Sequence, residues 1–415
     1  METVDTTAAA GDPVEGDRVE LVVGAVAHGG HCVARLDGRV VFVRHALPGE
    51  RVVAQITELH RGYLRADAVA VLDPAPDRVA PPCPYARPEL CGGCDLQHVA
   101  PAAQLVWKAD VVREQLHRLG GLTPDEVADL GVTVEALPGG PLGWRSRVRY
   151  AVDAAGRAGL LRHRTHQVVP VDRCLIAHPG VRDLPVLAAG GRRWPAAEVV
   201  ETVASSGGDV TVRALADGAA TVVDGPATVT ERAVGRDWRL PAEAFWQVHP
   251  AAADTLAGAV VDLLDPAPGE SAWDLYGGAG LFAAALADRV GPAARITLVE
   301  AAPVGVAAAR DNLRDLPGVE IVAARVETAL ARRRITGPVD LVVLDPPRAG
   351  AGAGVVRALV GAAPRAVAYV ACDPAAFARD VATFRSAGWR LAALRAYDLF
   401  PMTQHVECVG LLLPG

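Results

Sequence analysis

From about residue 243 to the C-terminus, short apolar runs alternate with alanine-rich runs of helical periodicity. Examples are "SAWDLY", "LFAAALADRV", "ARITLVE" and "PVGVAAARDNL", and the alternation continues through "VDLVVLDPP" and "AVAYVAC". Strands that alternate with helices in this way build a parallel sheet covered on both faces. The final run, "WRLAALRAYDLFPMTQHVECVGLLL", has two strand-like segments and no helix between them. The sequence therefore predicts an α/β, Rossmann-like sheet closed at its edge by an antiparallel pair.

Upstream of this half, the pattern changes twice. Residues 17–76 contain valine-rich, partly alternating runs joined by Asp37-Gly38, a tight hairpin signal, and predict a small five-stranded, OB-like β-barrel. Residues 77–240 begin with a cysteine-rich segment and a helical run and then return to short strands, so we expect an α+β middle domain. Residues 1–16 are acidic and are expected to form a frayed leader.

The chain has no run of eighteen apolar residues and no signal-peptide pattern at its start. We therefore expect no membrane span and a cytoplasmic location. The formal net charge is −7. Since proteins that coat nucleic acid nonspecifically are usually basic, any RNA binding must depend on a local basic patch.

A glycine-rich turn, "WDLYGGAGLF", follows the first strand of the C-terminal half. Gly277, Gly278 and Gly280 precede a helix, and glycines there let a ligand approach the backbone. Glu300 ends the next strand, where a carboxylate can accept hydrogen bonds from both hydroxyls of a ribose. Ala283 stands where a dinucleotide fingerprint would have another glycine, so we expect an adenosyl ligand without a pyrophosphate. The alternative is a tight turn in an ordinary α/β domain.

Two further polar turns follow later strands of this half. "VDLVVLDPPRAG" ends a strand at Asp345, and its two prolines fix an extended exit from the sheet. Cys372 ends the next strand, in "VACDP". The carboxyl ends of parallel strands lie at one rim, so both turns are expected beside the glycine-rich turn. A free cysteine is usually a packing residue, but this position favours a nucleophile.

Four motifs in order, "DLYGGAGLF", "LDPPRAG", "VACDPAAFARD" and "HVECVGLL", resemble the RNA uracil-5-methyltransferase family. Its members make 5-methyluridine in ribosomal and transfer RNA with S-adenosylmethionine. "FWQVHP" is similar to the family's Phe-x-Gln segment, the N-terminal barrel to its TRAM domain, and "CPYARPELCGGCDLQH" to its iron–sulfur motif. The resemblance is closer to the 23S rRNA branch than to the tRNA branch, and it implies a class I methyltransferase domain over residues 241–415.

The resemblance also implies roles for individual residues. Cys372 is the implied nucleophile, which adds to carbon 6 of uracil, and Glu407 is the implied base, which removes the proton from carbon 5. On the residues alone, Glu407 would be a solvated carboxylate at a strand edge. Asp345 is expected to hydrogen-bond the uracil edge or to position Cys372, and Arg348 is grouped with the RNA contacts. The implied cofactor-binding residues are Gln247, Tyr276, Gly278, Gly280, Glu300 and Asp345.

The chain departs from the family pattern at three places. The family often has Asn two residues after its glutamine, where this chain has His249, so His249 is left out of the expected site. Arg325 or Val326 stands where a small polar residue commonly contacts the adenine, which puts that contact in doubt. Ala371 replaces the Ser or Thr that commonly precedes the nucleophile.

Three of the seven cysteines have the spacing C-x7-C-x2-C, and a fourth follows much later. Four thiolates can hold either zinc or a [4Fe–4S] cluster. The resemblance favours the iron–sulfur cluster, with a structural or RNA-positioning role, and it supplies the reason for including the fourth cysteine. Cys32 and Cys408 are expected to be packing residues. The expected ligands are Cys83, Cys91, Cys94 and Cys174.

Residues 144–173 hold seven arginines and only two acidic residues. Arg145, Arg147 and Arg149 alternate, which would place them on one face of a strand as a phosphate-binding surface, with the barrel as a second RNA contact. A solvated sheet face is the alternative. A uridine within folded RNA must be flipped out to reach Cys372, and flipping needs such an anchor.

Two other functions remain compatible with parts of this pattern. The Asp345-Pro346-Pro347 turn also resembles that of amino-directed methyltransferases, but such an enzyme has no use for Cys372 and Glu407. A noncatalytic RNA-binding protein would bind RNA and leave the methyl donor unconsumed. We expect the enzyme, acting on rRNA or tRNA as a monomer.

Overall fold

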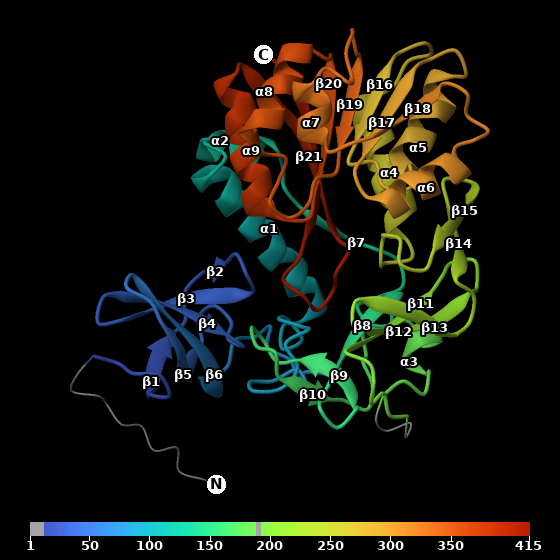
Figure 1. Cartoon of the computed structure of the whole chain (residues 1–415). Coiled ribbons are helices and arrows are strands. Elements are labelled where there is room, and N and C mark those ends of the chain that lie inside the picture. Colours follow the sequence, from blue (N-terminus) through green and yellow to red (C-terminus); the bar gives the residue numbers. More distant parts are fainter. Residues whose placement is uncertain (1–11, 188–191) are drawn as a thin grey trace.

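The computed structural model describes residues 12–187 and 192–415 of the chain. Figure 1 shows three parts: a small β-domain at the N-terminus, a second β-rich part, and a larger α/β part that contains the C-terminus. Most of the expected leader, residues 1–16, falls outside the described residues. Gly16 is described, and its N–H donates to the carbonyl of Ile56 at 2.9 Å, inside the N-terminal domain.

The N-terminal domain is a curled sheet around its own apolar core. Its strands are β1 (Arg18–Val22), β2 (Val26–Ala27), β3 (His31–Leu36), β4 (Arg39–Arg44), β5 (Arg51–Leu59) and β6 (Tyr63–Asp73), in the order β1-β5-β6-β4-β3-β2. Hydrogen bonds from Gly24 N–H to Val33 O and from Val33 N–H to Ala25 O bring the two ends of the sheet together. Asp37 and Gly38 both have positive φ, as a tight hairpin turn requires. The five longer strands correspond to the predicted barrel, and β2 adds two residues.

The second part is an antiparallel sheet with a separate hairpin. The sheet contains β8 (Arg147–Val152), β9 (Ala158–Leu161), β10 (Val168–Pro170), β11 (Val199–Ala204), β12 (Val210–Ala216) and β13 (Ala219–Asp224), in the order β10-β9-β8-β11-β12-β13. The short helix α3 (Pro179–Arg182) packs on β11, and the hairpin consists of β14 (Thr228–Ala233) and β15 (Arg236–Pro241).

The predicted middle domain, residues 77–240, does not form a single spatial unit. Its first elements, α1 (Pro101–Arg118), α2 (Pro124–Asp129) and β7 (Val134–Ala136), join the C-terminal part. β7 pairs in parallel with the last-but-one strand of the chain. The physical reason is the apolar face of α1: Ala109, Val112 and Leu116 pack into the C-terminal core, and Trp107 and Val111 pack into the barrel core. α1 therefore bridges the two domains.

The C-terminal part is an eight-stranded sheet. Its strands are β7, β16 (Ala272–Leu275), β17 (Ile296–Glu300), β18 (Val319–Ala323), β19 (Leu341–Leu344), β20 (Ala366–Ala371), β21 (Trp389–Asp398) and β22 (Glu407–Pro414), in the order β18-β17-β16-β19-β20-β22-β21-β7. The first five in this order are parallel, and β22 is antiparallel to both β20 and β21. The predicted parallel sheet with an antiparallel pair at its end is thus confirmed, and β7 extends it by one strand.

Helices cover both faces of this sheet, as predicted. One face packs on α4 (Ala252–Leu264), α5 (Leu281–Val290) and α6 (Pro303–Asn312), and the other on α1, α2, α7 (Val326–Ala331), α8 (Gly352–Ala362) and α9 (Pro374–Ser386). The strand order reverses between β16 and β19, whose following helices lie on opposite faces. Such a reversal opens a crevice at the carboxyl ends of the strands, where ligands bind in open α/β sheets. No helix among the described residues is long and apolar enough to cross a lipid bilayer.

Candidate active site

The strand register brings the predicted turns to one rim of the sheet. Leu275 of β16 pairs with Val299 of β17 and with Leu344 of β19. The next residues along these strands, Tyr276, Glu300 and Asp345, therefore leave the sheet at the same level. Ala371 of β20 pairs with Cys408 of β22. Continuing that antiparallel register by one residue sets Cys372 opposite Glu407.

A cavity of about 770 Å³ lies along this rim. Its wall comes from the C-terminal sheet, from the segment before α4 and from the cysteine-rich segment, so that the predicted adenosyl site and the predicted reactive groups share one space. The predicted residues that line it are Arg145, Gln247, Tyr276, Gly278, Glu300, Asp345, Arg348, Cys372 and Glu407.

Gly280 does not line the cavity, although the sequence analysis placed it among the cofactor contacts. It has φ +98°, and a Cβ at this position would lie 2.4 Å from Leu313 Cδ1. Gly280 is therefore required for the left-handed turn and for close packing behind the loop. Gly278, which has φ +55° and no atom within 4 Å of its Cβ position, is the glycine of the turn that faces open space.

Glu300 is held by the backbone around it. Its Oε2 accepts a hydrogen bond from Gly278 N–H at 2.9 Å, and its Oε1 accepts from Ala301 N–H at 2.7 Å and Ala302 N–H at 2.6 Å. A carboxylate offers about four lone-pair positions. Backbone N–H groups use three of these positions, so about one remains for a ribose hydroxyl in the cavity.

Asp274, near the end of β16, connects this strand to the start of α5 and so stabilises the glycine-rich turn between them. Its Oδ2 accepts a hydrogen bond from Ala283 N–H in the first turn of α5 at 2.9 Å, and its Oδ1 is buried without a partner. Complete burial raises the pKa of the Asp274 carboxyl to about 7, and the charges of Asp345 and Glu300 act in the same direction. The sequence analysis did not single out Asp274, because a buried acid at a strand end resembles any other strand residue.

The reactive groups expected at this rim share one electrostatic environment. Burial raises the pKa of the half-buried Cys372 thiol to about 12, and the charges of Glu407 and Asp345 add to this, whereas Arg348 opposes it. Burial also raises the pKa of Asp345 to about 7. The pKa of the fully buried Glu407 carboxyl is raised by burial first and then by Asp345, again against Arg348. Two neighbouring buried carboxyl groups resist ionising together.

The loop that carries Asp345 and Arg348 is anchored to α9 by a buried acid. Asp380 Oδ2 accepts hydrogen bonds from Tyr369 Oη at 2.6 Å and from Ala351 N–H at 2.8 Å. Gly350 has φ +87°, and a Cβ there would lie 2.7 Å from Asp380 Oδ2. The glycine that ends the "DPPRAG" motif is thus needed for this close approach.

A second loop, residues 399–406 between β21 and β22, brings Phe400, Thr403 and His405 to the cavity. His405 Nε2 lies 3.4 Å from Arg348 Nη2. Burial lowers the pKa of His405 to about 4, assisted by the charges of Arg348 and Lys108, so His405 is neutral at pH 7. The sequence analysis missed His405, although its place two residues before Glu407 was a signal that could have found it.

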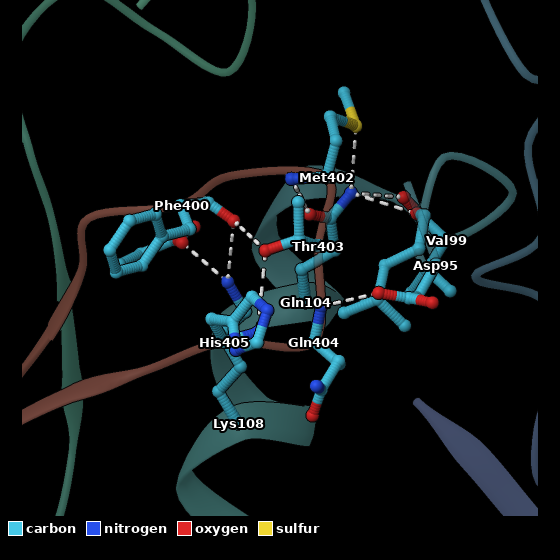
Figure 2. Close-up of polar contacts among 11 residues, drawn as sticks. Asp95, Val99, Gln104, Lys108, Phe400, Met402, Thr403, Gln404 and His405 are labelled. Carbon is cyan, nitrogen blue, oxygen red and sulfur yellow. Dashed lines mark hydrogen bonds and ion pairs between the residues drawn. The ribbon is translucent and has the colours of Figure 1, made fainter. Parts of the chain in front are cut away.

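Figure 2 shows how this loop is clamped onto α1 and the cysteine-rich segment. Lys108 is 1% exposed and its Nζ lies 2.5 Å from Asp398 Oδ1 and 3.2 Å from Phe400 O. Gln104 Oε1 accepts a hydrogen bond from Met402 N–H at 3.0 Å. Asp95 N–H donates to Met402 O at 3.0 Å. Lys108, the only lysine of the chain, therefore forms a buried structural ion pair with Asp398.

The four predicted metal ligands meet at a second, much smaller cavity of about 30 Å³. Cys83, Cys91, Cys94 and Cys174 all line it, and Gly93 N–H donates to Cys91 Sγ at 3.4 Å. Four soft sulfur donors and a backbone N–H directed at one of them fit an iron–sulfur or zinc centre in donor chemistry. In the side-chain positions described, no three His, Cys, Asp or Glu residues are already arranged around a common ion position.

The three alternating arginines differ in what they contact. Arg147 is mostly buried: its Nη1 donates to Ala242 O at 3.1 Å and Ala244 O at 2.9 Å, and its Nη2 lies 3.2 Å from Glu231 Oε1. It supports the chain before Gln247 and is not open to a phosphate, contrary to the expectation from sequence. The same-face argument fails because β14 and the segment after β15 cover that end of β8.

Arg145 and Arg149 remain accessible. Arg145 lies at both the active-site cavity and the cysteine cavity, and its Nε donates to Arg147 O at 3.2 Å. Arg149 has a side chain that is 64% exposed and pairs with Glu201 at 3.4 Å. Phe245, the first residue of the Phe-x-Gln segment and one to which the sequence assigned no role, lines the active-site cavity with 72% of its surface exposed. An exposed aromatic at the mouth of a cavity has no sequence signature of its own.

Comparison with known proteins agrees with this geometry. The TRAM domain family matches residues 14–69, and the tRNA (uracil-5-)-methyltransferase family matches residues 222–414. A protein of Streptomyces avermitilis named as an uncharacterized RNA methyltransferase is 49% identical over 96% of this chain and 99% of its own length. The 23S rRNA (uracil(1939)-C(5))-methyltransferase RlmD of Alkalilimnicola ehrlichii is 34% identical over 94% of this chain and 95% of its own length.

A solved structure shares the whole fold. The Pyrococcus abyssi tRNA (uracil-54, C5)-methyltransferase, in complex with S-adenosyl-L-homocysteine, superposes with a TM-score of 0.71, 21% identity, and coverage of 94% of this chain and 99% of that one. The matches cover the barrel, the region between and the C-terminal sheet. This chain belongs to the tRNA (uracil-5-)-methyltransferase family and carries an N-terminal TRAM domain.

Proposed function

We propose that this chain transfers a methyl group from S-adenosylmethionine to carbon 5 of a uridine in RNA, with Cys372 as the covalent nucleophile and Glu407 as the base. The observation that carries this proposal is that Cys372 and Glu407 open onto the same cavity as Gly278 and Glu300. A methyl donor held at the glycine-rich turn and a uracil ring that contacts the Cys372 thiol can therefore occupy the same cavity.

The first step falls to Cys372. Carbon 5 of uracil is a poor nucleophile, and addition of a thiolate at carbon 6 moves an electron pair onto carbon 5 as an enolate. The thiol must first lose its proton to solvent in the cavity, which the raised pKa of about 12 makes unfavourable in the free protein. Arg348 is the nearby cation that favours the thiolate. Attack on the base is thus expected after the RNA and the methyl donor have entered the cavity.

The later steps fall to Glu407. When bound, S-adenosylmethionine supplies the methyl group at a positively charged sulfur. The bond from carbon 5 to the methyl carbon forms as the methyl–sulfur bond breaks. Glu407 then takes the proton from carbon 5, the double bond between carbons 5 and 6 returns, and the bond from carbon 6 to Cys372 Sγ breaks. Burial raises the pKa of the Glu407 carboxyl, so its carboxylate is a stronger proton acceptor than an exposed one.

The cavity walls supply positions for both substrates. Glu300 and Gly278 support the ribose and the backbone-facing part of the donor, with Gln247 and Tyr276 as further contacts. Asp345 can accept a hydrogen bond from the uracil edge. The exposed ring of Phe245 offers the flipped base a flat apolar surface at the cavity mouth.

The proposed RNA is 23S rRNA, with tRNA as the second choice. The relative that is named for 23S rRNA shares 34% identity over nearly all of both chains. The solved tRNA enzyme has the same fold, but at 21% identity this likeness says nothing about which RNA this chain modifies. An RNA substrate also supports the expected cytoplasmic site of action. We also propose that the protein acts as a monomer, which light scattering can test.

We also propose that Cys83, Cys91, Cys94 and Cys174 hold a [4Fe–4S] cluster, with zinc as the alternative. All four thiols line one small cavity, and Gly93 N–H is directed at Cys91 Sγ. Arg145 contacts both cavities, so such a centre would act by fixing the wall of the active site rather than by redox chemistry. Iron, sulfide and zinc analysis of anaerobically purified protein tests the assignment.

The test of the proposed function is a map of 5-methyluridine in RNA. RNA from a strain that lacks this protein should lose 5-methyluridine at one position, and the wild-type gene should restore it. The Cys372→Ala gene should not. If the missing modification is a methylated exocyclic amine, or if no modification is missing, the proposal is wrong.

A further inference from the structure

The turn between β2 and β3 of the barrel, residues 28–30, lies against the turn that carries Cys372 and against the loop that precedes Glu407. His28 Nε2 lies 3.2 Å from Asp373 Oδ2, and Asp373 directly follows Cys372. On the other side of the turn, a Cβ on Gly30 would lie 2.8 Å from Asp95 Cβ and 3.1 Å from Gln404 Cβ. Gly30 has φ +74°, so this close contact depends on glycine both for space and for backbone geometry.

Asp373 uses its two carboxylate oxygens for two different partners. Oδ1 accepts a hydrogen bond from Ala376 N–H at 2.8 Å and caps the N-terminus of α9, and Oδ2 faces His28. Burial alone would raise the pKa of Asp373, but the hydrogen bonds from His28 and from Ala376 N–H bring it below its ordinary value. The carboxylate is therefore held as an anion, in a fixed orientation, one peptide bond from Cys372.

A second contact links the barrel to the loop before Glu407. Asp95 Oδ2 accepts a hydrogen bond from Gln404 N–H at 3.2 Å, and its Oδ1 lies 3.5 Å from Arg44 Nη2 of the barrel. Arg44 is only 6% exposed and also lies 3.8 Å from Asp67. The barrel thus contacts the nucleophile turn through His28, and it is linked through Arg44 and Asp95 to the loop that precedes Glu407.

We propose that His28 is a positioning residue that orients Asp373 and thereby the Cys372 turn, so that the barrel completes the active site in addition to any contact it makes with RNA. This inference rests on the proposed function, in which Cys372 is the nucleophile. Misplacement of a reacting atom by about 1 Å can cost about 10²-fold in rate. Loss of the His28–Asp373 contact should therefore slow the chemical step, while the affinity for RNA changes little.

The test compares single-turnover rates and RNA affinities in the full-length protein. The RNA probe is total RNA from a strain that lacks this protein, with saturating S-adenosylmethionine. We expect His28→Ala to lower the single-turnover methylation rate by about tenfold and to leave the Kd for the RNA unchanged within error. His28→Gln, whose amide N–H can replace Nε2–H, should recover most of the rate.

The chain offers a matched control on the same domain. His60 Nε2 lies 2.9 Å from Glu58 Oε2, an equivalent histidine–carboxylate contact that stays within the barrel. His60→Ala should leave the single-turnover rate unchanged. Asp373→Ser preserves a side chain that can cap α9 but removes the partner of His28. The double variant His28→Ala/Asp373→Ser should be no slower than Asp373→Ser alone, because both changes break the same contact.

Three outcomes would contradict the inference: an unchanged rate in His28→Ala, a loss confined to RNA affinity, or rate losses that multiply in the double variant. A loss confined to RNA affinity would make His28 an RNA contact, and multiplying rate losses would make it an independent structural residue. Thermal melting checks that each variant is folded, and a folding defect shared by His28→Ala and His28→Gln also counts against the inference. If the wild-type protein neither methylates the RNA nor forms an adduct with it, the proposed function fails instead.

Discussion

Cys372 and the four cysteines of the small cavity are all at least partly buried, yet their surroundings differ. Cys372 lies at a cavity of about 770 Å³ with two buried carboxyl groups, whereas Cys83, Cys91, Cys94 and Cys174 line a cavity of about 30 Å³ with one another. Burial raises the pKa of Cys372 to about 12 and that of Cys91 to about 11. The acidity of the thiol therefore does not separate the two groups. The neighbouring groups do separate them. Cys372 faces a large cavity and two carboxyl groups, whereas the other four cysteines face one another.

The largest expected effect is at the reactive cysteine. Cys372→Ala removes the proposed nucleophile, and we expect the single-turnover methylation rate to fall by about 10⁴-fold or more, with RNA affinity retained. Filter binding and methyl transfer from labelled donor measure the two quantities. The packing cysteine Cys408 provides the control: it is fully buried next to Glu407, and Cys408→Ala should retain most of the rate. Equal rates for wild type and Cys372→Ala would remove the distinction between the two groups of cysteines.

The next effect is at the base. Glu407→Gln cannot accept the proton from carbon 5, so the reaction should stop at the methylated covalent adduct and turnover should fall by about 10²- to 10⁴-fold. A band of RNA-linked protein should accumulate on a denaturing gel. Normal turnover without that band would show that another group removes the proton.

A substitution at the small cavity should change metal content and thermal stability rather than the chemistry of methyl transfer. Cys91→Ser should lose bound metal and lower the melting temperature by about 5 °C or more, because a ligand of a structural centre is missing. Any methylation that remains should keep the wild-type pH profile, since the reactive groups are elsewhere. An altered pH profile at an unchanged metal content would mean that Cys91 acts in the chemistry.

A smaller effect should appear in the pH dependence of stability. The folded-state pKa of Asp345 is raised from 3.8 to about 7, so its protonated form favours the folded state. This stabilisation is complete below the unfolded pKa and is lost as the pH rises towards 7. Asp345→Asn should therefore unfold at higher urea than wild type at pH 8 and at similar urea at pH 4. Asp315, whose pKa is lowered by its hydrogen bond from Arg236, should give the opposite slope.

The smallest effects concern the two arginines of β8. Arg149→Ala should weaken RNA binding a few-fold and reduce the salt dependence of log K by about one unit. Arg147→Ala should instead lower the free energy of unfolding, because Glu231 and two carbonyl groups lose a buried partner. If the two variants changed the salt dependence equally, the structural assignment of Arg147 would be wrong.

The sequence was most informative where chain order dictates position. Alternating strands and helices force the ends of β16, β17, β19 and β20 to one rim, so the order of the motifs alone predicts that the cofactor turn, Asp345 and Cys372 lie together. Glu407 depended on the family resemblance, because an acid at the start of an antiparallel strand has no distinctive pattern. Its position opposite Cys372 follows from the register of β20 and β22.

The remaining features depend on contacts between distant segments. The alternation of Arg147 could not show that Glu231 would cover it, and the helical pattern of α1 could not show that α1 would bridge the barrel and the C-terminal sheet. His28 occupies an unremarkable sequence position. His405 and Phe245 stand within quoted motifs, but their place at the cavity depends on neighbours in distant parts of the chain. Motifs reflect what the local chain requires, whereas these contacts form only when whole domains pack against one another.

The most direct measurement of the central claim is peptide mapping of a trapped adduct. RNA transcribed with 5-fluorouridine should be methylated and then remain bound, because the fluorine at carbon 5 cannot leave as a proton. After nuclease and protease digestion, mass spectrometry should find a methylated fluorouridine nucleotide on the peptide that contains Cys372. A modified peptide that contains Cys83, Cys91, Cys94 or Cys174 instead, or no covalent product while ordinary RNA is methylated, would contradict the account.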